Sequence, residues 1–183
     1  SRLYNSSNSK VSQSLFTYNL KGNLLSYESW LNGAVNPKNS YAYDSFGNII
    51  SDTNANLYTI TYGYDPNKVF IVNATTPKWH TSFYQYDYGT GNMISKTDPN
   101  NIKIEYKYDS FGREIKEILP YDSESSPTVE YIYETDGTPP ERKKIKQKEN
   151  NLGTKDTFEY YDGFGNIVQT KSESEDSRFI TYD

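Results

Sequence analysis

The sequence predicts an all-β protein in which tandem antiparallel β-hairpins pair edge to edge into a twisted, curved strip of sheet. A Tyr-x-Tyr-Asp motif returns along the chain with its acidic or amide residue at positions 19, 44, 65, 87, 109, 134, 162 and 183, which is every 21 to 28 residues. Repeats of this length are typical of arrays in which one supersecondary unit stacks on the next. Turn-forming residues follow each motif, and no stretch has the apolar spacing of a helix.

Most copies contain one or two tyrosines, an acidic or amide residue, and a glycine near the end of the turn. The residues that we assign to the structural repeat motif are Tyr18, Asn19, Gly22, Tyr41, Tyr43, Asp44, Gly47, Tyr62, Tyr64, Asp65, Tyr84, Tyr86, Asp87, Gly91, Tyr106, Tyr108, Asp109, Gly112, Tyr131, Tyr133, Gly137, Tyr161, Asp162 and Gly165. We interpret them as structural, because a uniform array offers no unique position for chemistry.

The Tyr-x-Tyr pair predicts the first strand of each hairpin. Side chains on a strand alternate between its two faces. In the copy at 102–108, the isoleucines and tyrosines therefore share one face, and the lysines and the glutamate share the other. This pattern predicts a strand that is buried on one face and solvated on the other.

The residues after the tyrosines predict the turn and the return strand. Asp is favoured at the first position of a type I turn, where its carboxylate accepts backbone N–H bonds, and Gly at the fourth position can take positive φ. We therefore expect Asp44 and Asp109 to bond amides of their own turns, with Gly47 and Gly112 at positive φ. Return strands are expected at 48–51 and 113–118, and because a lone hairpin is marginally stable, neighbouring hairpins should pair.

Several segments depart from this pattern. The linkers at 52–56, 98–101 and 120–127 carry turn residues without periodicity. The copy at 65–69 lacks the Gly-Asn turn, the copy at 87–91 has one extra residue, and the sixth copy places a Pro-Pro pair after Gly137. In the seventh copy Tyr161 is out of step with Phe158 and Tyr160, so we expect a β-bulge at Tyr160 or Tyr161 that brings Phe158 and Tyr161 to one face.

The composition fits a thin sheet better than a thick core. The hydrophobic fraction is 34%, below the roughly 45–50% usual for globular domains, yet 16% of the residues are aromatic and 19 are tyrosine. Tyrosine buries its ring while its hydroxyl stays hydrated or bonded. A net charge of -5 argues against a nucleic-acid partner, and the lack of cysteine excludes disulfides. No apolar run approaches the length of a membrane span.

Two metal or catalytic interpretations of the acidic residues compete with turn capping. The repeated Asp44, Asp65, Asp87, Asp109 and Asp162 could form a row of ligands or general acids, but Asp at these positions caps turns. Calcium could bind the Asn- and Asp-rich loops at 52–56 or 98–101. Neither loop has the ligand spacing of a recognised calcium loop, so we expect no cofactor.

Other residues with potential chemistry have structural interpretations. His80 is the only histidine, and no Gly-x-Ser-x-Gly motif supports a catalytic role for it. Trp30 and Trp79 could stack on sugars, but we interpret them as part of the one-sided core of the strip. The basic cluster at 142–148 could bind phosphate, although its alternation around Ile145 is typical of a return strand. We expect no enzymatic activity.

The motif copies resemble those of the YD-repeat, or RHS-repeat, family. The family signature is a Tyr-Asp pair followed by a Gly-Asn or Gly-Arg turn every twenty-odd residues, as in 41–49, 106–113 and 161–167 of this chain. The resemblance covers residues 14–183, leaving 1–13 as an N-terminal flank. The family includes components of Tc toxins, Rhs polymorphic toxins and the animal teneurins. The stretch at 161–171 is most similar to the Tc-B and SpvB-like branch.

This resemblance implies a hollow β-shell that encloses a toxic or unfolded cargo segment. It implies that the chain is a non-catalytic structural piece of a large secreted or cell-surface bacterial protein. The partners would be other parts of the parent chain and the cargo, with self-association through open sheet edges. The family's autoproteolytic site has no match here, because the Asp98-Pro99-Asn100 segment lacks the required glycine. The alternative function is an adhesion module that binds carbohydrate or protein. Since the last motif stops at Asp183, we expect a longer parent protein.

Overall fold

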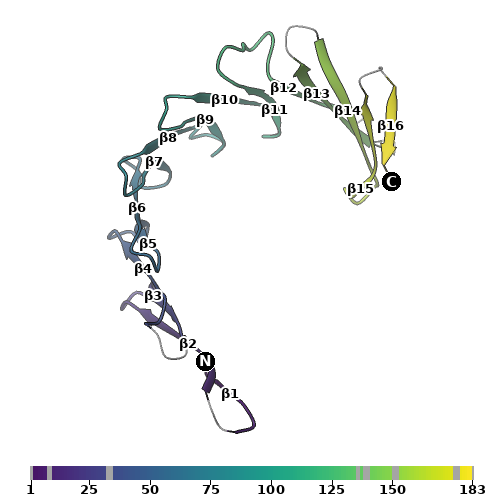
Figure 1. Ribbon diagram of the computed structural model, residues 1–183. Helices are drawn as coiled ribbons and strands as arrows, with labels where there is room; N and C mark the ends of the chain where they lie inside the picture. Colours follow the sequence, from purple (N-terminus) through teal and green to yellow (C-terminus); the bar gives the residue numbers. More distant parts are fainter. Residues whose placement is uncertain are drawn as a thin grey trace. The chain divides into compact units, whose positions relative to one another are not determined.

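The computed structural model describes residues 2–7, 10–31, 35–134, 137, 141–149, 153–174 and 178–182. All regular elements in these ranges are β-strands, and the expected all-β array is confirmed (Figure 1). The strands lie in the sheet in the order of the sequence. The chain forms two compact units, the first of residues 1–84 with 98–100 and the second of residues 85–97 with 101–183.

The first unit contains seven complete strands and the start of an eighth. They are β1 (Arg2–Tyr4), β2 (Lys10–Tyr18), β3 (Leu24–Ser29), β4 (Lys38–Tyr43), β5 (Ile49–Thr53), β6 (Thr59–Tyr64), β7 (Ile71–Thr75) and β8 (Thr81–Tyr86). Each strand pairs antiparallel with the next along the chain. The expected division between a flank at 1–13 and an array at 14–183 falls inside β2, and it stays a prediction.

The second unit contains the remaining eight strands. They are β9 (Met93–Thr97), β10 (Lys103–Tyr108), β11 (Glu114–Ile118), β12 (Val129–Glu134), β13 (Glu141–Glu149), β14 (Gly153–Tyr161), β15 (Ile167–Glu173) and β16 (Phe179–Tyr182). These strands also pair antiparallel in chain order. Asp136, Pro139, Pro140 and Asp183 lie outside the described residues.

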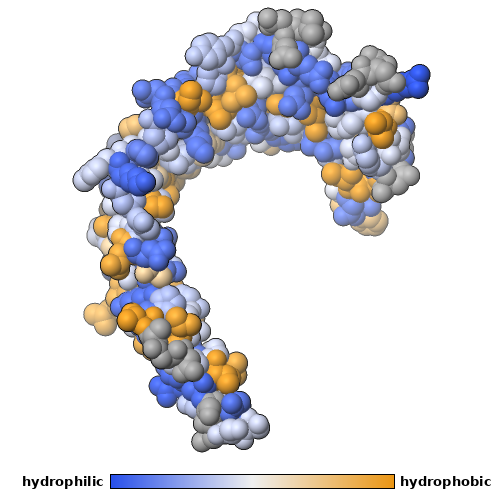
Figure 2. Space-filling view, in the orientation of Figure 1, coloured by the Kyte–Doolittle hydropathy of each residue, from blue (hydrophilic) through white to orange (hydrophobic). Residues whose placement is uncertain are grey.

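The described strands have almost no apolar core. Ile118, at 7% exposure, is the one buried apolar residue among the described positions, while many apolar side chains remain exposed (Figure 2). In β10 both faces are half-buried and only Lys103 is exposed. The expected burial of one face was therefore wrong. In a single layer of sheet, a side chain is shielded from water only by the side chains beside it. Neither face is therefore fully buried.

The turn geometry predicted for the motif is confirmed. The Oδ1 atom of Asp44 accepts hydrogen bonds from the N–H groups of Phe46 and Asn48, both at 2.9 Å. The backbone N–H of Asp44 donates to the carbonyl of Asn48, and Gly47 has φ of 94°. The turns that begin at Asn19, Asp109 and Asp162 have the same pattern.

The remaining turns reveal a regularity that the sequence did not indicate. In the copy at 65–69, Lys68 takes the left-handed position with φ of 60° where other copies have glycine. The linker turns adopt similar geometry, with Leu57 at φ of 65° and Trp79 at 62°. Asn54 accepts bonds from the N–H groups at 56 and 58, as the motif acids do in their turns. The segments at 54–58 and 76–80 are thus hairpin turns, which agrees with the turn residues noted in the linker at 52–56.

The bulge expected in the seventh copy is present but lies on the other strand. Because β14 pairs with β13 in an unbroken register, Phe158 and Tyr161 stay on opposite faces, so the expectation that they share a face was wrong. The register shifts because Tyr160 pairs with Gln169 and Tyr161 with Ile167, which leaves Val168 as the extra residue on β15. The same shift places an extra residue on the return strand in four other hairpins: Leu25, Ile50, Val72 and Ile115. The bulge is therefore a regular feature of these hairpins. It distinguishes the motif hairpins from the pairings of β5 with β6 and β7 with β8, which follow left-handed Leu57 and Trp79 but keep an unbroken register.

This turn geometry predicts that Gly112→Val destabilises the protein more than Asp109→Asn. Gly112 has φ of 78°, where a β-branched residue is strained by about 1–2 kcal/mol. Asn at position 109 keeps an acceptor for the turn amides, as Asn19 does. Thermal unfolding of both variants checks this, and equal midpoints would contradict the turn assignment.

Candidate functional site: contacts between consecutive hairpins

A tyrosine hydroxyl joins each of four hairpins to the hairpin before it. The donor is the motif tyrosine next to the turn acid, and the acceptor is the backbone carbonyl of the first residue of the preceding return strand. The four bonds are Tyr43 to Leu24 at 2.8 Å, Tyr64 to Ile49 at 3.0 Å, Tyr108 to Met93 at 2.8 Å and Tyr133 to Glu114 at 2.9 Å. We call these bonds the tyrosine staples.

The bulge explains why the staple reaches this carbonyl. A bulge disrupts the ladder locally, and a backbone carbonyl without a partner costs free energy in a partly buried place. Leu24, Ile49 and Glu114 each stand at the register shift of their hairpin. The staple therefore supplies a donor where the bulge interrupts the ladder. Sequence reasoning assigned the tyrosines to one face but missed their acceptor.

The sixth and seventh copies support this explanation, because within their described residues the sixth hairpin lacks the bulge and the tyrosine of the seventh lacks the staple. The hairpin of β12 and β13 has an unbroken register from Val129 to Glu134 and so has no bulge. Tyr161, which occupies the staple position after it, donates instead to Glu159 of its own strand at 2.6 Å. Where the preceding hairpin lacks a bulge, the tyrosine thus makes a different bond.

Consecutive turns are also linked through their side chains. Asn48 donates from Nδ2 to the carbonyl of Lys68 at 2.9 Å, and Lys21 donates to the carbonyl of Ser45 at 2.7 Å. In the second unit, Asn92 lies 3.5 Å from the carbonyl of Gly112. The asparagine after the turn therefore reaches the left-handed residue of the next turn. This contact gives the Gly-Asn part of the motif a role between repeats.

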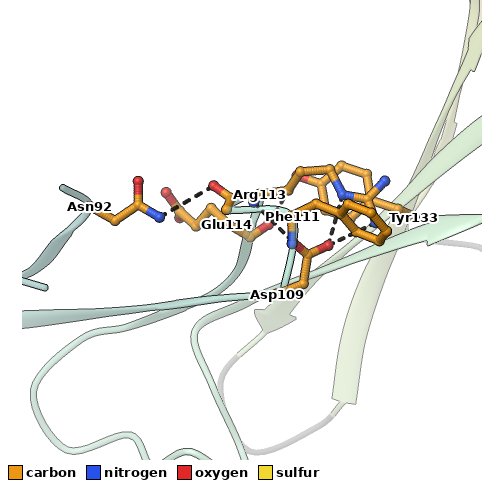
Figure 3. A network of polar contacts seen from close by, with 7 residues as sticks. Asn92, Asp109, Phe111, Arg113, Glu114 and Tyr133 are labelled. Carbon is orange, nitrogen blue, oxygen red and sulfur yellow. Dashed lines mark hydrogen bonds and ion pairs between the residues drawn. The ribbon is translucent and has the colours of Figure 1, made fainter. Parts of the chain in front are cut away.

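Arg113 replaces that asparagine in the fifth copy and makes a different link (Figure 3). Its guanidinium pairs with Asp109 at 2.7 Å and lies 4.2 Å from the ring centre of Tyr133 in the next hairpin. Tyr133 in turn staples to Glu114. The turn acid, the arginine and the next tyrosine thus form one connected set, in which a planar guanidinium stacks on a ring.

The turn bonds lower the pKa of three motif acids. The hydrogen bonds from the Asn166 side chain and backbone hold the pKa of Asp162 below its ordinary value. Burial alone would raise the pKa of Asp44 and of Asp109, but the bonds from their own turns outweigh it and lower both. On the strands, burial raises the pKa of several tyrosines: Tyr62, Tyr64, Tyr106, Tyr108 and Tyr131.

The two faces of the first unit differ in chemistry. Strand alternation and register place the aromatic residues of β2 to β6, together with Ile60, on one face, which we call the tyrosine face: Phe16, Tyr18, Tyr27, Tyr41, Tyr43, Ile60, Tyr62 and Tyr64. At one end of this face the rings of Phe16 and Tyr27 contact each other, with their centres 5.0 Å apart.

The opposite face of the first unit carries rows of small hydroxyl residues, which the sequence analysis missed. This hydroxyl face consists of Thr17, Ser26, Ser40, Ser51, Thr53, Thr59, Thr61, Thr75 and Thr81. Its members bond across strands, with hydroxyl distances of 2.8 Å for Thr53 and Thr59 and 2.9 Å for Thr75 and Thr81. A period of two in the small residues between the aromatics could have revealed it.

The basic cluster at 142–148 forms strand β13, and acids of neighbouring segments pair with its side chains. Lys143 pairs with Glu159 and Lys144 with Asp156, each at 2.6 Å. The other pairs of this strand are Arg142 with Glu134, Lys146 with Glu130 and Lys148 with Asp122. These partners supply the negative charge that a phosphate would otherwise provide, so the interpretation as a return strand holds.

The other candidate residues do not converge on one site. The backbone N–H of His80 closes the turn at 76–80 by bonding to the hydroxyl of Thr76, and Trp79 is 87% exposed. Trp30 lies under Lys10, with 4.4 Å between Nζ and the ring centre. The described part of the chain has no cluster of three metal-ligating side chains. It also has no helix long and apolar enough to cross a membrane.

The staple predicts that Tyr108→Phe lowers the free energy of unfolding by about 1 kcal/mol, because the carbonyl of Met93 loses its donor. Tyr106→Phe is the matched control on the same strand, since its hydroxyl has no bonding partner in the described part of the chain. Urea unfolding of both variants measures the difference. Equal losses would show that the staple contributes nothing.

The lowered acid pKa values predict a loss of stability at low pH. A carboxyl with a depressed native pKa stabilises the fold above its unfolded value of about 3.9, and this contribution disappears as the pH falls through the native pKa. We expect the double variant Asp44→Asn, Asp162→Asn to lose less thermal stability than the parent between about pH 5 and pH 2. Asn19 already forms the same turn bonds with an amide. Identical acid-side slopes would refute the assignment.

No family model and no curated protein matches this sequence. Among solved structures, the crystal structure of TcdB2-TccC3-Cdc42 matches 98% of this chain with a TM-score of 0.51 and 17% identity, and the match covers 9% of that chain. A crystal structure of TcdB2-TccC3 gives a TM-score of 0.47 and 13% identity over 90% of this chain and 12% of its own. The structure of the Photorhabdus luminescens Tc holotoxin pore gives a TM-score of 0.41 and 13% identity, and the match covers 95% of this chain and 13% of that chain.

Of these three matches the first exceeds a TM-score of 0.5, and it establishes the fold. The chain spans a small part of that protein's length, so the likeness concerns a strip of hairpins and carries no activity of the whole toxin. The resemblance found in the Tyr-Asp motif is thereby confirmed at the level of architecture: this chain has the hairpin-strip fold of the YD-repeat, or RHS-repeat, proteins of Tc toxins.

Proposed function

We propose that this chain is a structural wall segment of a large YD-repeat protein, in which the strip of hairpins helps to enclose a toxin or other cargo segment. The observation that carries this proposal is the tyrosine staple. Each stapled hairpin completes the backbone bonding of the hairpin before it, so the repeats extend one continuous sheet. A long sheet built one repeat at a time is suited to forming a wall.

The arrangement of polar groups supports a non-catalytic role. Catalysis needs a nucleophile, a base and stabilising donors that converge on one point. In this chain the motif acids cap their turns, and the cations of β13 pair across strands. We therefore expect the segment to act by containment, keeping cargo away from solvent and proteases.

The proposed partners follow from the same role. They are other parts of the parent chain and the enclosed cargo, with self-association through open sheet edges when the strip is isolated. An acidic chain of net charge -5 is a poor partner for nucleic acid. By family resemblance, we place the protein outside the bacterial cell, secreted or at the surface.

An adhesion module that binds carbohydrate or protein is the alternative function. The observation that favours it is the exposure of large aromatic residues at turn tips, such as Phe46 at 75%, Trp79 at 87% and Phe164 at 94%. Exposed apolar residues of this kind can mark interaction sites.

Deletion of one repeat tests containment in the full-length parent. Removing 54–75 joins Thr53 to Thr76, which starts an equivalent turn, so the strip should stay paired but become one repeat shorter. We expect limited proteolysis to cut the enclosed segment faster in this variant, because the wall no longer closes. Phe46→Ala at an exposed turn tip is the control and should leave protection unchanged.

Continued protection of the cargo after the deletion, with the strip still folded by circular dichroism, would contradict the wall proposal. Binding of the isolated chain to a glycan array, abolished by Trp79→Ala, would favour the adhesion module instead.

A further inference from the structure

The tyrosine face of the first unit contains two adjacent hollows of about 490 and 440 Å³. The first is lined by Leu25, Tyr41 and Tyr43 together with the turn at 19–21, and the second by Ile49, Asp52, Tyr62, Tyr64 and Ile71. Each hollow thus combines a Tyr-x-Tyr pair with a branched aliphatic residue of the bulge before it. Both hollows are shallow and open to solvent, so they suit an extended ligand that lies across the strands better than an enclosed small molecule.

The spacing of the hollows is set by the backbone. Equivalent positions on β4 and β6 are two strands apart, which is about 9.6 Å at the normal spacing of paired strands. A polyproline II helix rises about 3.1 Å per residue and repeats every three residues, or about 9.3 Å. Prolines three residues apart in an extended ligand would therefore enter consecutive hollows.

The hydroxyls of the hollows are divided between two roles. The hydroxyls of Tyr43 and Tyr64 donate the staple hydrogen bonds. In the described part of the chain, the hydroxyls of Tyr41 and Tyr62 have no hydrogen-bond partner. Free tyrosine hydroxyls beside apolar hollows suit a polyproline II ligand, because its rings dock on aromatic side chains and its carbonyls remain available as acceptors.

Asp52 lines the second hollow on the side of the first and provides a negative charge there. It lies on β5 on the tyrosine face, opposite Tyr41 on one side and Ile60 on the other. Its carboxylate makes no ion pair within the described residues. A half-buried acid in this place would attract a basic side chain from a ligand that crosses the strands.

We propose that the tyrosine face of the first unit binds an extended, proline-rich basic segment in the polyproline II conformation, with two prolines three residues apart in the two hollows and an intervening Arg or Lys on Asp52. The ligand runs across the strands from β3 to β7. This binding does not depend on containment, so it can hold or fail independently of the wall proposal.

Titration of the intact chain with synthetic peptides tests the proposal. A peptide of four Pro-Ala-Arg triplets should bind, with resonance shifts or heat from the tyrosine face. A peptide with prolines four residues apart should bind about tenfold more weakly, because only one ring can dock. A peptide of Pro-Ala-Glu triplets should also be weaker, since its acids meet Asp52.

Matched variants separate the site from general effects on folding. Tyr62→Leu should weaken the Pro-Ala-Arg peptide about tenfold, and Asp52→Asn should remove the preference for Arg over Glu. Thr61→Val, on the hydroxyl face of the same strand, should change neither. Circular dichroism confirms that each variant is folded. Equal binding of both proline spacings, no binding at millimolar peptide, or a larger loss from Thr61→Val than from Tyr62→Leu would overturn the proposal.

Discussion

The hydrogen bond from a motif tyrosine to the bulge of the hairpin before it is the contact on which the rest of the strip depends. In five hairpins the return strand carries a bulge close to its first residue, and the bulge interrupts the regular ladder there. Tyr43, Tyr64 and Tyr133 supply a donor at that point, and Tyr108 donates to the corresponding carbonyl of Met93. In these hairpins the bulge of one repeat and the tyrosine of the next therefore act together, because the tyrosine hydroxyl bonds the carbonyl next to the bulge.

A strip without a core tolerates variation in single copies. Each described strand contacts only the strands beside it in the sheet. An irregular repeat therefore disturbs its own pairing and leaves the pairing of more distant strands unchanged. Lys68 replaces a turn glycine, the turn at 87–91 is one residue longer, and Tyr161 bonds within its own strand. The antiparallel ladder continues on both sides of the Lys68 and Tyr161 positions. Stability in such a sheet comes from the ladder, the turns and the lateral packing of side chains rather than from one buried centre.

The difference between its two faces is the feature of the first unit that bears most directly on function. The hydroxyl face satisfies many of its polar groups internally, through bonds such as that between Thr53 and Thr59, and offers little apolar surface in these rows. The tyrosine face presents rings, hollows and the carboxylate of Asp52. A wall with such faces would be inert on one side and adhesive on the other. This asymmetry is compatible with both a containing wall and a surface that binds extended segments.

The sequence by itself determined the hairpins, the turn acids and the sharing of a face by the tyrosines, because these follow from a period of two and from turn chemistry within a few residues. It did not reveal the bulge on five of the return strands, the acceptor of the tyrosine hydroxyl, or the left-handed backbone at Leu57 and Trp79. Those features arise where a side chain meets a hairpin some 15 to 19 positions away, as Tyr64 meets Ile49 and Tyr43 meets Leu24. Leu57 and Trp79 take left-handed backbone that their residue types do not favour. Only the tertiary structure decided these features, because pairing with neighbouring strands overrides the backbone preference of the single residue.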